Sequence, residues 1–529
     1  MMKDKFYRVI KLFVFLILVT HILLPLLALL TQISMEDIVK VVTSNQFLPM
    51  LKNSLISTTV ATLVSIFLAL SLAWCINRTN VKHKGLITIL FTLPMLIPSI
   101  SHGMGLTILF GDNGIITNLT GINIHLFGLT GIVIGATLYA FPAAFLMFSD
   151  IFSYEDYTVY EVANVLGLTK FQQFIKITFP NLKKSLISAV FAVFTMIFTD
   201  YGVPLVVGGK YTTLPVYMYR EVIGLMDYSK GAVLGIVLLI PAVIAFIIDL
   251  INKEEGSSGT IAKPYVISKN KKRDFFANVY CLFILFLISI PIITFLVLCF
   301  VNQYPIDFSF TLNNIHQSFE LGLKNYLLNS LLIALSTSLF GTIISYTTAY
   351  ITARSNKELS SLALHFISLI SLSIPGIVLG LSYVLFFKTS FIYGTFIILI
   401  SVNIIHFFGS PYLMAYNALL KFNTHLEDVA TTLGISKIQM LKDVYVPSTS
   451  DTILEMFGYN FVNSMVTISA ISFLANFKNM PIALLIPQFD SQSLIGPIAF
   501  ISIIILVINI AMKLIIHYLK RHFQNKEVY

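Results

Sequence analysis

Long runs of apolar residues, separated by short polar segments, dominate this chain. A helix needs about 20 apolar residues to cross the roughly 30 Å hydrocarbon core of a bilayer. A membrane β-barrel would instead show segments of about ten residues with alternating polarity, and we find none. We therefore predict about twelve membrane-spanning helices, at residues 12–32, 53–76, 86–110, 127–149, 185–207, 231–251, 276–300, 328–352, 361–387, 392–418, 449–474 and 496–517.

The composition agrees with a polytopic membrane protein and adds an orientation. Of the 529 residues, 57% are hydrophobic and 11% are charged. Loops rich in Lys and Arg are retained in the cytoplasm. With a cytoplasmic N-terminus, 26 of the 34 Lys and Arg residues fall in inside segments. This count predicts a multi-pass protein of the bacterial cytoplasmic membrane with both termini in the cytoplasm. Topology then explains the net charge of +9, and we expect no nucleic-acid partner.

The chain also repeats itself, with matching motifs 267 to 277 residues apart. Two six-helix halves separated by an even number of spans have the same orientation, as in parallel transporter repeats related by an axis along the membrane normal. We predict an all-α polytopic fold of two parallel repeats: a first permease half at 1–252, a cytoplasmic linker at 253–274 and a second half at 275–529. The matching motifs are Asn53-Ser54-Leu55 with Asn329-Ser330-Leu331, Arg78-x-Asn80 with Arg354-x-Asn356, Ile97-Pro98 and Gly103 with Ile374-Pro375 and Gly380, and Gly167 with Gly434.

One repeated segment is polar. EVANVLGLTKFQQFIKITFP at 161–180 returns as DVATTLGISKIQMLKDVYVP at 428–447, with seven of twenty positions identical. In each copy a capping box starts a short helix, a glycine ends it, a second capping box starts another helix, and a proline begins the next span. The alternative interpretation is that these are ordinary helical loops. Against it, the two copies of this segment are more alike than the apolar spans that flank them. The residues are Thr158-x-x-Glu161, Gly167, Thr169-x-x-Gln172 and Pro180, and then Thr424-x-x-Glu427, Gly434, Ser436-x-x-Gln439 and Pro447.

Both copies resemble the signature loop of the membrane permeases of ATP-binding-cassette importers. That signature is Glu-Ala-Ala, three residues, Gly, nine residues, then Ile-x-Leu-Pro. The departures are mild: Val for the middle Ala in both copies, Phe179 and Val446 for Leu, and Asp428 for Glu. The resemblance extends over the whole chain, because some of these permeases, such as ferric-iron permeases, carry both halves in one polypeptide. The fitting residues are Glu161-Val162-Ala163, Gly167, Ile177 and Pro180, and Asp428-Val429-Ala430, Gly434, Val444 and Pro447.

The resemblance implies a type I importer transmembrane fold in which each loop inserts a coupling helix into one ATPase subunit. It implies as partners two ATP-binding subunits on the cytoplasmic side and an extracellular or periplasmic solute-binding protein, besides the lipid bilayer. The small alanines would allow close approach to the ATPase, and the glycine turns would fix the angle of each helix. The implied coupling residues are Glu161, Ala163, Gly167, Asp428, Ala430 and Gly434.

No enzyme motif accompanies these loops. A Gly-x-x-x-x-Gly-Lys-Ser/Thr nucleotide loop is absent, because Gly209-Lys210 is followed by Tyr211. Neither hydrolase nor metalloprotease patterns occur. We expect no catalytic, cofactor or metal site, and ATP hydrolysis by a separate chain.

The alternative from another class is a secondary transporter or channel driven by an ion gradient. It would carry intramembrane acids or unwound helices, and Pro94, Pro98 and Pro375 with nearby glycines are compatible with that. Dependence on ATP and a partner ATPase distinguishes the two classes.

For the cargo, FTDYGVPLVVGGKY at 198–211 and the residues that follow resemble permeases assigned to 2-aminoethylphosphonate uptake. NSMVTISAISFL at 463–474 fits both those and the ferric-iron permeases. A phosphonate is therefore the preferred cargo and ferric iron the second candidate. Periodicity carries no information about cargo.

Asp200 lies within the predicted span 185–207. A carboxylate at that depth costs a few kcal/mol unless it is paired or faces water. One hypothesis is that Asp200, with Tyr201, lines the translocation path and meets the ammonium end of a zwitterionic cargo. The other is a helix-end contact, which Gly202 and Pro204 favour because they suggest that the helix ends nearby.

Overall fold

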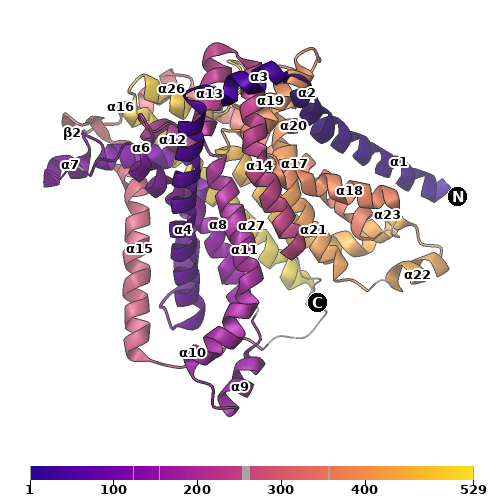
Figure 1. The fold of residues 1–529 in the computed structure, drawn as a ribbon. Coiled ribbons are helices and arrows are strands. Elements are labelled where there is room, and N and C mark those ends of the chain that lie inside the picture. Colours follow the sequence, from indigo (N-terminus) through magenta and orange to yellow (C-terminus); the bar gives the residue numbers. More distant parts are fainter. Residues whose placement is uncertain are drawn as a thin grey trace.

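The computed structural model describes residues 2–122, 124–153, 155–252, 263–354, 358–423 and 425–527. Long helices form one bundle with short helices at both ends, as Figure 1 shows. In the described residues, eight helical stretches are long and apolar enough to cross a membrane. They are α1 to α2 (Met2–Leu18, η1 Val19–Leu23, Leu24–Thr31), α4 (Phe47–Arg78), α8 (Leu129–Ser153), α10 to α11 (Lys170–Phe198), α14 (Tyr228–Asn252), α15 (Lys271–Leu298), α17 (Leu323–Ala353) and α27 (Ile495–Glu527).

Two bent helix pairs raise this number to ten. Leu359–Ser373 and Gly376–Phe387 (α18, η4 and α19) meet at 113°, and Phe396–His406 and Gly409–Leu420 (α20 and α21) meet at 52°. The polytopic helical fold is thus confirmed, apart from one short two-stranded sheet, with fewer unbroken spans than the twelve apolar runs. The other two runs form shorter helices. Residues 86–110 give α5 (Lys84–Phe91), η2 (Leu93–Leu96) and α6 (Ser99–Phe110), and residues 449–474 give α25 (Ser450–Val466) followed by turns.

Proline explains the breaks at matching positions of the two halves. Pro98 directly precedes α6, and Pro375 directly precedes α19. Proline lacks a backbone N–H and clashes with the preceding turn, so a helix cannot continue through it undistorted. Each break changes the direction of the chain. The helix after the break packs against a later segment: α6 against the residues after α11, and α19 against the residues after α25. A Cβ on Gly380 would lie 2.6 Å from the carbonyl oxygen of Ala470, and a Cβ on Gly103 would lie 3.3 Å from that of Val203.

Short elements cap both ends of the bundle. One end, called the loop end below, carries α9 (Tyr157–Val165) and α22 (His425–Thr432). The opposite end, called the hairpin end, carries an antiparallel two-stranded sheet, β1 (Val301–Gln303) and β2 (Asp307–Phe310). The same end carries α3 (Met35–Val42), α7 (Ile115–Thr120), α13 (Leu214–Leu225), α16 (Asn313–Glu320) and α26 (Leu485–Ser491), which η6 (Ile482–Leu484) directly precedes.

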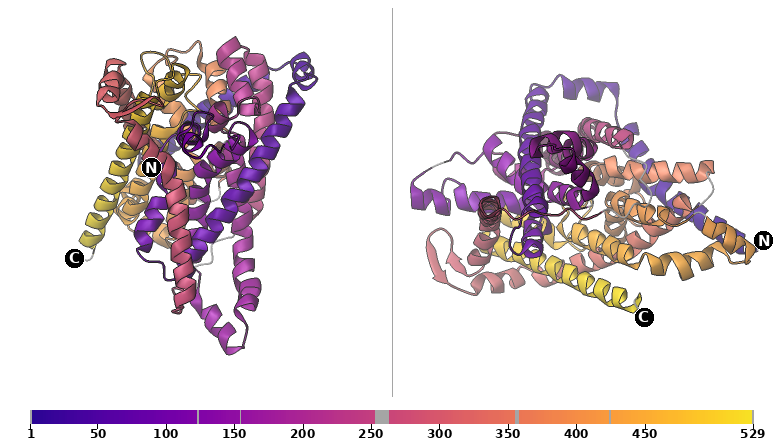
Figure 2. Two further views of the ribbon diagram at one scale, coloured as in Figure 1. Left: turned by 90° about the vertical axis from the view of Figure 1, so that its left-hand side faces the viewer. Right: turned by 90° about the horizontal axis from the view of Figure 1, so that it is seen from below.

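The first helix of each half packs against the other half. The stretch α1 to α2 lies on α19, and the hydroxyl of Tyr383 donates to the carbonyl oxygen of His21 at 3.0 Å. Conversely α15 packs on α5 and α6. It also contacts α4, which is tilted against it (Figures 1 and 2), and the hydroxyls of Ser71 and Tyr280 lie 2.6 Å apart. The two halves are therefore intertwined and do not form separate bundles.

The repeated Asn-Ser motif anchors matching segments at the hairpin end. In each half the asparagine side chain donates to a backbone carbonyl, and the serine hydroxyl accepts a backbone N–H. Both contacts fix the chain that enters α13 or η6. The pairs are Asn53 with Thr212 O (3.1 Å) and Ser54 with Leu214 N (2.7 Å), then Asn329 with Met480 O (3.2 Å) and Ser330 with Ile482 N (2.7 Å).

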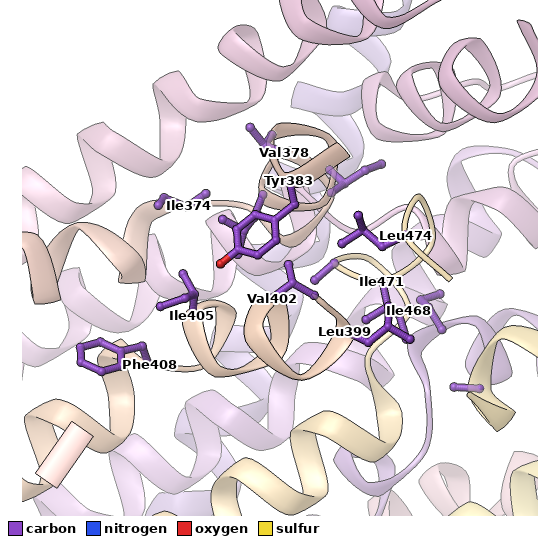
Figure 3. Packing of buried hydrophobic residues seen from close by; sticks show 14 of the residues in the cluster. Ile374, Val378, Tyr383, Leu399, Val402, Ile405, Phe408, Ile468, Ile471 and Leu474 are labelled. Atoms are coloured by element: carbon purple, nitrogen blue, oxygen red, sulfur yellow. The ribbon is translucent and has the colours of Figure 1, made fainter. Parts of the chain in front are cut away.

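A large hydrophobic core joins the halves. Figure 3 shows the part in which α19, α20 and the turns after α25 pack together. The non-helical segment 467–475 is therefore held by buried apolar contacts. The residues labelled in Figure 3 are Ile374, Val378, Tyr383, Leu399, Val402, Ile405 and Phe408, which pack around Ile468, Ile471 and Leu474 of this segment.

Candidate functional site: the repeat loops and the junction of the halves

The first polar repeat, called loop 1 (residues 155–178), is a helix, a glycine turn and a second helix. Gly167 follows α9 with φ +72°, in the left-handed region that glycine adopts at little cost. Thr169 and Gln172 form the predicted capping box at the start of α10 (Lys170–Gln173). The other predicted box is wrong: Asp156 caps α9 by accepting the N–H of Thr158 at 3.0 Å. An aspartate one residue before the helix supplies this acceptor, which leaves Thr158 inside the helix.

Loop 2 (residues 422–445) repeats this arrangement. Gly434 follows α22 with φ +68°, and Ser436 with Gln439 forms the predicted capping box of α23 (Lys437–Met440). Thr424, predicted to begin the other box, lies outside the described residues. Asn356 of the Arg-x-Asn repeat and residues 253–262 of the linker also lie outside them.

The second short helix of each loop runs on into the bundle through a π-turn. In loop 1, α10 passes through η3 (Phe174–Thr178) into α11 (Phe179–Phe198), and Pro180 stands in the first turn of α11. In loop 2, α23 passes through η5 (Leu441–Tyr445) into α24 (Val446–Ser448), which contains Pro447, and then α25. Such π-turns are frequent at functional sites. Each loop is thus directly continuous in sequence with helices of the bundle.

Both loops expose an apolar surface. Val165 keeps 87% of its surface exposed and Leu433 keeps 68%. A cluster of exposed large apolar side chains commonly marks an interaction surface. Two of its positions, Val162 with Val429 and Leu166 with Leu433, are identical in the two sequence copies, a signal that could have identified the surface from sequence. The exposed residues are Val159, Val162, Val165, Leu166, Phe171 and Ile175 in loop 1, and Val429, Leu433 and Ile435 in loop 2.

The residues predicted to couple the loops fall into three groups. Ala163 and Ala430 are buried, at 2% and 4% exposed, so their small size serves packing within the chain. A Cβ on Gly167 or Gly434 would meet nothing within 4 Å, so these glycines are needed for backbone conformation alone. The acidic residues are accessible: the Glu161 carboxylate lies 2.5 Å from Lys263 Nζ, and that of Asp428 lies 3.5 Å from His425 Nδ1.

Asp200 follows α11 rather than lying within it. One carboxylate oxygen accepts the Ser99 hydroxyl at 2.7 Å, and the other accepts the N–H of Val203 at 3.0 Å, in the first turn of α12 (Gly202–Val207). Asp200 is therefore at a helix end, as the second hypothesis predicts. A cavity of about 10 Å³ beside it, lined also by Ser54 and Thr213, has room for about one water.

Tyr201 lies where the two halves meet. It is buried, and its hydroxyl donates to the carbonyl oxygen of Ile468 at 3.4 Å. Its ring stacks on Tyr219 with centroids 4.6 Å apart, and Tyr219 stacks on Phe473 at 6.3 Å. Three aromatic rings from separate segments thus span the junction at this level.

Two stretches, residues 61–253 and 345–525, match the family described as binding-protein-dependent transport system inner membrane component. The chain belongs to this family, whose members are multi-pass inner-membrane permeases of ATP-binding-cassette transporters. The matches fall one in each predicted half.

Individual relatives share about a quarter of their residues with this chain. The ferric transport system permease protein FbpB of Actinobacillus pleuropneumoniae is 26% identical over 465 residues, 83% of this chain and 66% of that protein. The putative ferric transport system permease protein FbpB 1 of Haemophilus influenzae is 25% identical over 507 residues, 90% and 79% of the two chains. The sulfate transport system permease protein CysT of Escherichia coli is 26% identical over 247 residues, 44% and 88%.

The covered share of each relative shows how this chain compares with it in length. This chain spans slightly less than two thirds of the first relative's length. Less than half of it covers most of CysT, as expected if each half corresponds to one separate permease chain. The expected resemblance to phosphonate permeases finds no support in these names, which refer to ferric and sulfate transport.

Proposed function

We propose that this chain is the permease subunit of an ATP-binding-cassette importer in which loop 1 and loop 2 each dock one separate ATP-binding subunit. The observation that carries the proposal is the exposed apolar surface presented twice, beside a left-handed glycine turn, at Leu166 and Leu433. Burial of such a surface stabilises a complex by about 25 cal/mol per Å² of apolar area before the cost of association. Because one chain carries two such loops, we expect two ATPase subunits for each permease chain.

The continuity of each loop with a bundle helix suits this role. ATP-driven closure of two ATPases would bring the loops together, and η3 and η5 would carry the movement into α11 and α25. Packed helices shift as rigid bodies rather than deforming, so a displacement at one end reaches the other. The Lys and Arg distribution supports a cytoplasmic loop end, with both termini on that side.

For the cargo we favour ferric iron, delivered by an external solute-binding protein at the hairpin end. This rests on two relatives named for ferric transport that match 83% and 90% of this chain. The resemblance of residues 198–211 to aminoethylphosphonate permeases makes that phosphonate the second candidate. Asp200 and Tyr201, at the junction of the halves, are our candidates for residues beside the path. The Tyr201–Tyr219–Phe473 stack would then close its outer end in this conformation.

Reconstitution of the chain with an ATPase and a solute-binding protein that co-purify with it tests the proposal. We expect two ATPase subunits per permease chain, and ATP hydrolysis stimulated by binding protein loaded with Fe³⁺. Stimulation by 2-aminoethylphosphonate instead would change the cargo but keep the class. If no ATPase binds and an ion gradient alone drives uptake, the chain is a secondary transporter and the proposal fails.

A further inference from the structure

Each half places an arginine at the loop end of its second spanning helix. Arg78 is the last residue of α4, and Arg354 directly follows α17. Both are buried, at 4% and 9% exposed. A buried charge is costly unless it is paired and hydrogen-bonded, so these two side chains need an explanation.

In the first half the arginine is tied to loop 1. Its Nη2 bonds to Oε2 of Glu155, whose Oε1 accepts the hydroxyl of Tyr160. The Tyr160 hydroxyl lies 2.7 Å from Oγ1 of Thr178, at the end of η3. The ring of Tyr265, from the chain after the first half, covers the guanidinium with its centroid 3.6 Å from Cζ. Arg78 thereby joins α4 to both ends of loop 1.

In the second half the arginine is tied to loop 2 in the same way. Nε and Nη2 of Arg354 donate to the two carboxylate oxygens of Glu427 at 2.6 and 2.5 Å, a bidentate geometry. Its Nη1 and Nη2 also donate to the carbonyl oxygens of Phe422 and Asn423, both at 2.9 Å. Tyr445, at the end of η5, donates its hydroxyl to Glu427 at 2.5 Å.

The two clusters use different positions of the repeat. Tyr160 matches Glu427, and Thr178 matches Tyr445, each 267 residues apart. The acid of the second half therefore stands at the position of the first half's phenol, and its phenol stands at the position of Thr178, while the arginine stays at its position. Each half therefore forms a cluster of arginine, carboxylate and phenol, although the acid and the phenol come from non-matching positions. This indicates that both halves require a link between the arginine and the loop.

The helices that carry these arginines reach the opposite end of the bundle. From Ser54 to Arg78, and from Ser330 to Arg354, each helix path covers 24 residues, about 36 Å at 1.5 Å per residue. At the far end, Ser54 and Ser330 bind the backbone entering α13 and η6. One straight element thus contacts a repeat loop at one end and a hairpin-end segment at the other.

We propose that Arg78 and Arg354 are positioning residues that fasten each loop to α4 or α17, so that ATPase-driven movement of the loop displaces the hairpin-end segments. This inference rests on the proposed function of the loops. It adds a second route to the direct one through α11 and α25. Loss of an arginine cluster would leave the ATPase bound but disconnect its cycle from the outer end of the path.

The test uses neutral pairs that remove the ionic link without leaving one buried charge alone: Arg354→Gln with Glu427→Gln, and Arg78→Gln with Glu155→Gln. In the reconstituted complex we expect ATPase binding and basal ATP hydrolysis within about twofold of wild type, and cargo uptake per ATP reduced about tenfold. The matched control is Lys520→Gln with Glu455→Gln, which removes the more exposed Lys520–Glu455 pair and should change nothing.

Two outcomes overturn the inference. If uptake falls only in proportion to ATPase binding, the arginines merely fold the loops. If uptake per ATP is unchanged, the link carries no movement. Arg354→Lys keeps a charge but cannot make the bidentate bond, so it gives a reading should the neutral pair fail to fold, and reduced uptake per ATP is expected there too. Failure of the wild-type chain to bind any ATPase would instead refute the proposed function.

Discussion

Ser99, the first residue of α6, donates its hydroxyl to Asp200 at 2.7 Å and so ties the broken helix to the segment after α11. Ser99 also lies close to Gly202, and the second half has the matching pair in reverse order along the chain, with the glycine first (Gly376) and the serine second (Ser469). A Cβ on Gly202 would lie 2.4 Å from the hydroxyl oxygen of Ser99, whereas a Cβ on Gly376 would lie 2.3 Å from that of Ser469. Each junction holds one serine and one glycine because there is room for only one side chain.

The Asp200 contacts lead to a prediction for Asp200→Asn. The N–H groups of Gly202 and Val203 donate to different oxygens of the carboxylate, at 3.3 and 3.0 Å. The amide has one acceptor oxygen, so one of these N–H groups loses its partner at about 1–3 kcal/mol. We expect lower yield and lower thermal stability of the detergent-solubilised protein, with uptake falling in parallel. Normal yield and stability with uptake lost would instead assign Asp200 to the translocation path. Ser99→Ala, which removes the side-chain hydrogen bond to the same carboxylate, serves as the matched variant.

Gly167 and Gly434 adopt a left-handed conformation without steric crowding. A non-glycine residue there costs roughly 1–2 kcal/mol and a β-branched one more, whereas Asn tolerates the region. The double variant Gly167→Val with Gly434→Val should abolish cargo-stimulated ATP hydrolysis while membrane insertion persists. The corresponding Asn variants should retain most of it. Equal activity of the Val and Asn pairs would show that the turn angle is unimportant.

The exposed loop surfaces should govern ATPase affinity. Leu166→Asp and Leu433→Asp place a charge where a buried apolar contact is proposed, and each should weaken ATPase binding at least about tenfold. Binding is measured by titration of fluorescent ATPase onto the permease in nanodiscs. Leu119→Asp alters an equally exposed leucine in α7, near the hairpin end, and should leave ATPase affinity unchanged. A similar loss for all three would point to general misfolding.

The serine anchors at the hairpin end predict a stability effect. Ser54→Ala or Ser330→Ala leaves the N–H of Leu214 or Ile482 without its acceptor, at a cost of about 1–3 kcal/mol. We expect a lower melting temperature for both variants. Ser338→Ala, on the same helix as Ser330, removes a hydroxyl that bonds only to Ala334 O of its own helix and should have little effect. Unchanged melting of all three would argue against the anchors.

Loop 2 should be sensitive to acid. Burial alone would raise the pKa of Glu427, but hydrogen bonds from Arg354 and Tyr445 outweigh burial and lower that pKa below its usual value. A lowered folded-state pKa gives stability that is complete above about pH 4.5 and is lost as the pH falls through the folded pKa. Thermal melts between pH 7 and 3 should therefore fall less steeply for Glu427→Gln than for wild type. Parallel curves would contradict this assignment.

Much of the fold follows from local physics that a sequence displays. Bilayer thickness fixes the length of apolar runs, so eight unbroken spans and two bent pairs could be located, whereas the runs at 86–110 and 449–474 form shorter helices in the described residues. The glycine turns and the capping boxes at Thr169 and Ser436 depend on neighbours within three residues. Packing partners could not be read in this way, because a run of apolar residues does not specify which helix it contacts. The exchange of α1 to α2 and α15 between the halves was therefore not predicted.

The site shows the same division. The loops were found because they repeat, and the repeated Arg-x-Asn motif gave a signal for Arg78 and Arg354. The partners of these arginines were not predicted, because the acid and the phenol occupy non-matching positions in the two halves and a comparison of the copies does not align them. The burial of Ala163 and Ala430 could not be predicted either, because a sequence does not tell which side of a short helix faces the protein.

The exchange of first helices has a consequence for biosynthesis. His21 and Tyr383 are 362 residues apart in the chain but bonded in the fold. At about 5–20 residues per second, the ribosome adds the partner of the first helix roughly 20–70 s after that helix emerges. During this interval the helix waits in the lipid with its packing face uncovered. Because both halves come from one ribosome, the partner arrives in the same place at a fixed ratio of one to one, and no search through the membrane is needed.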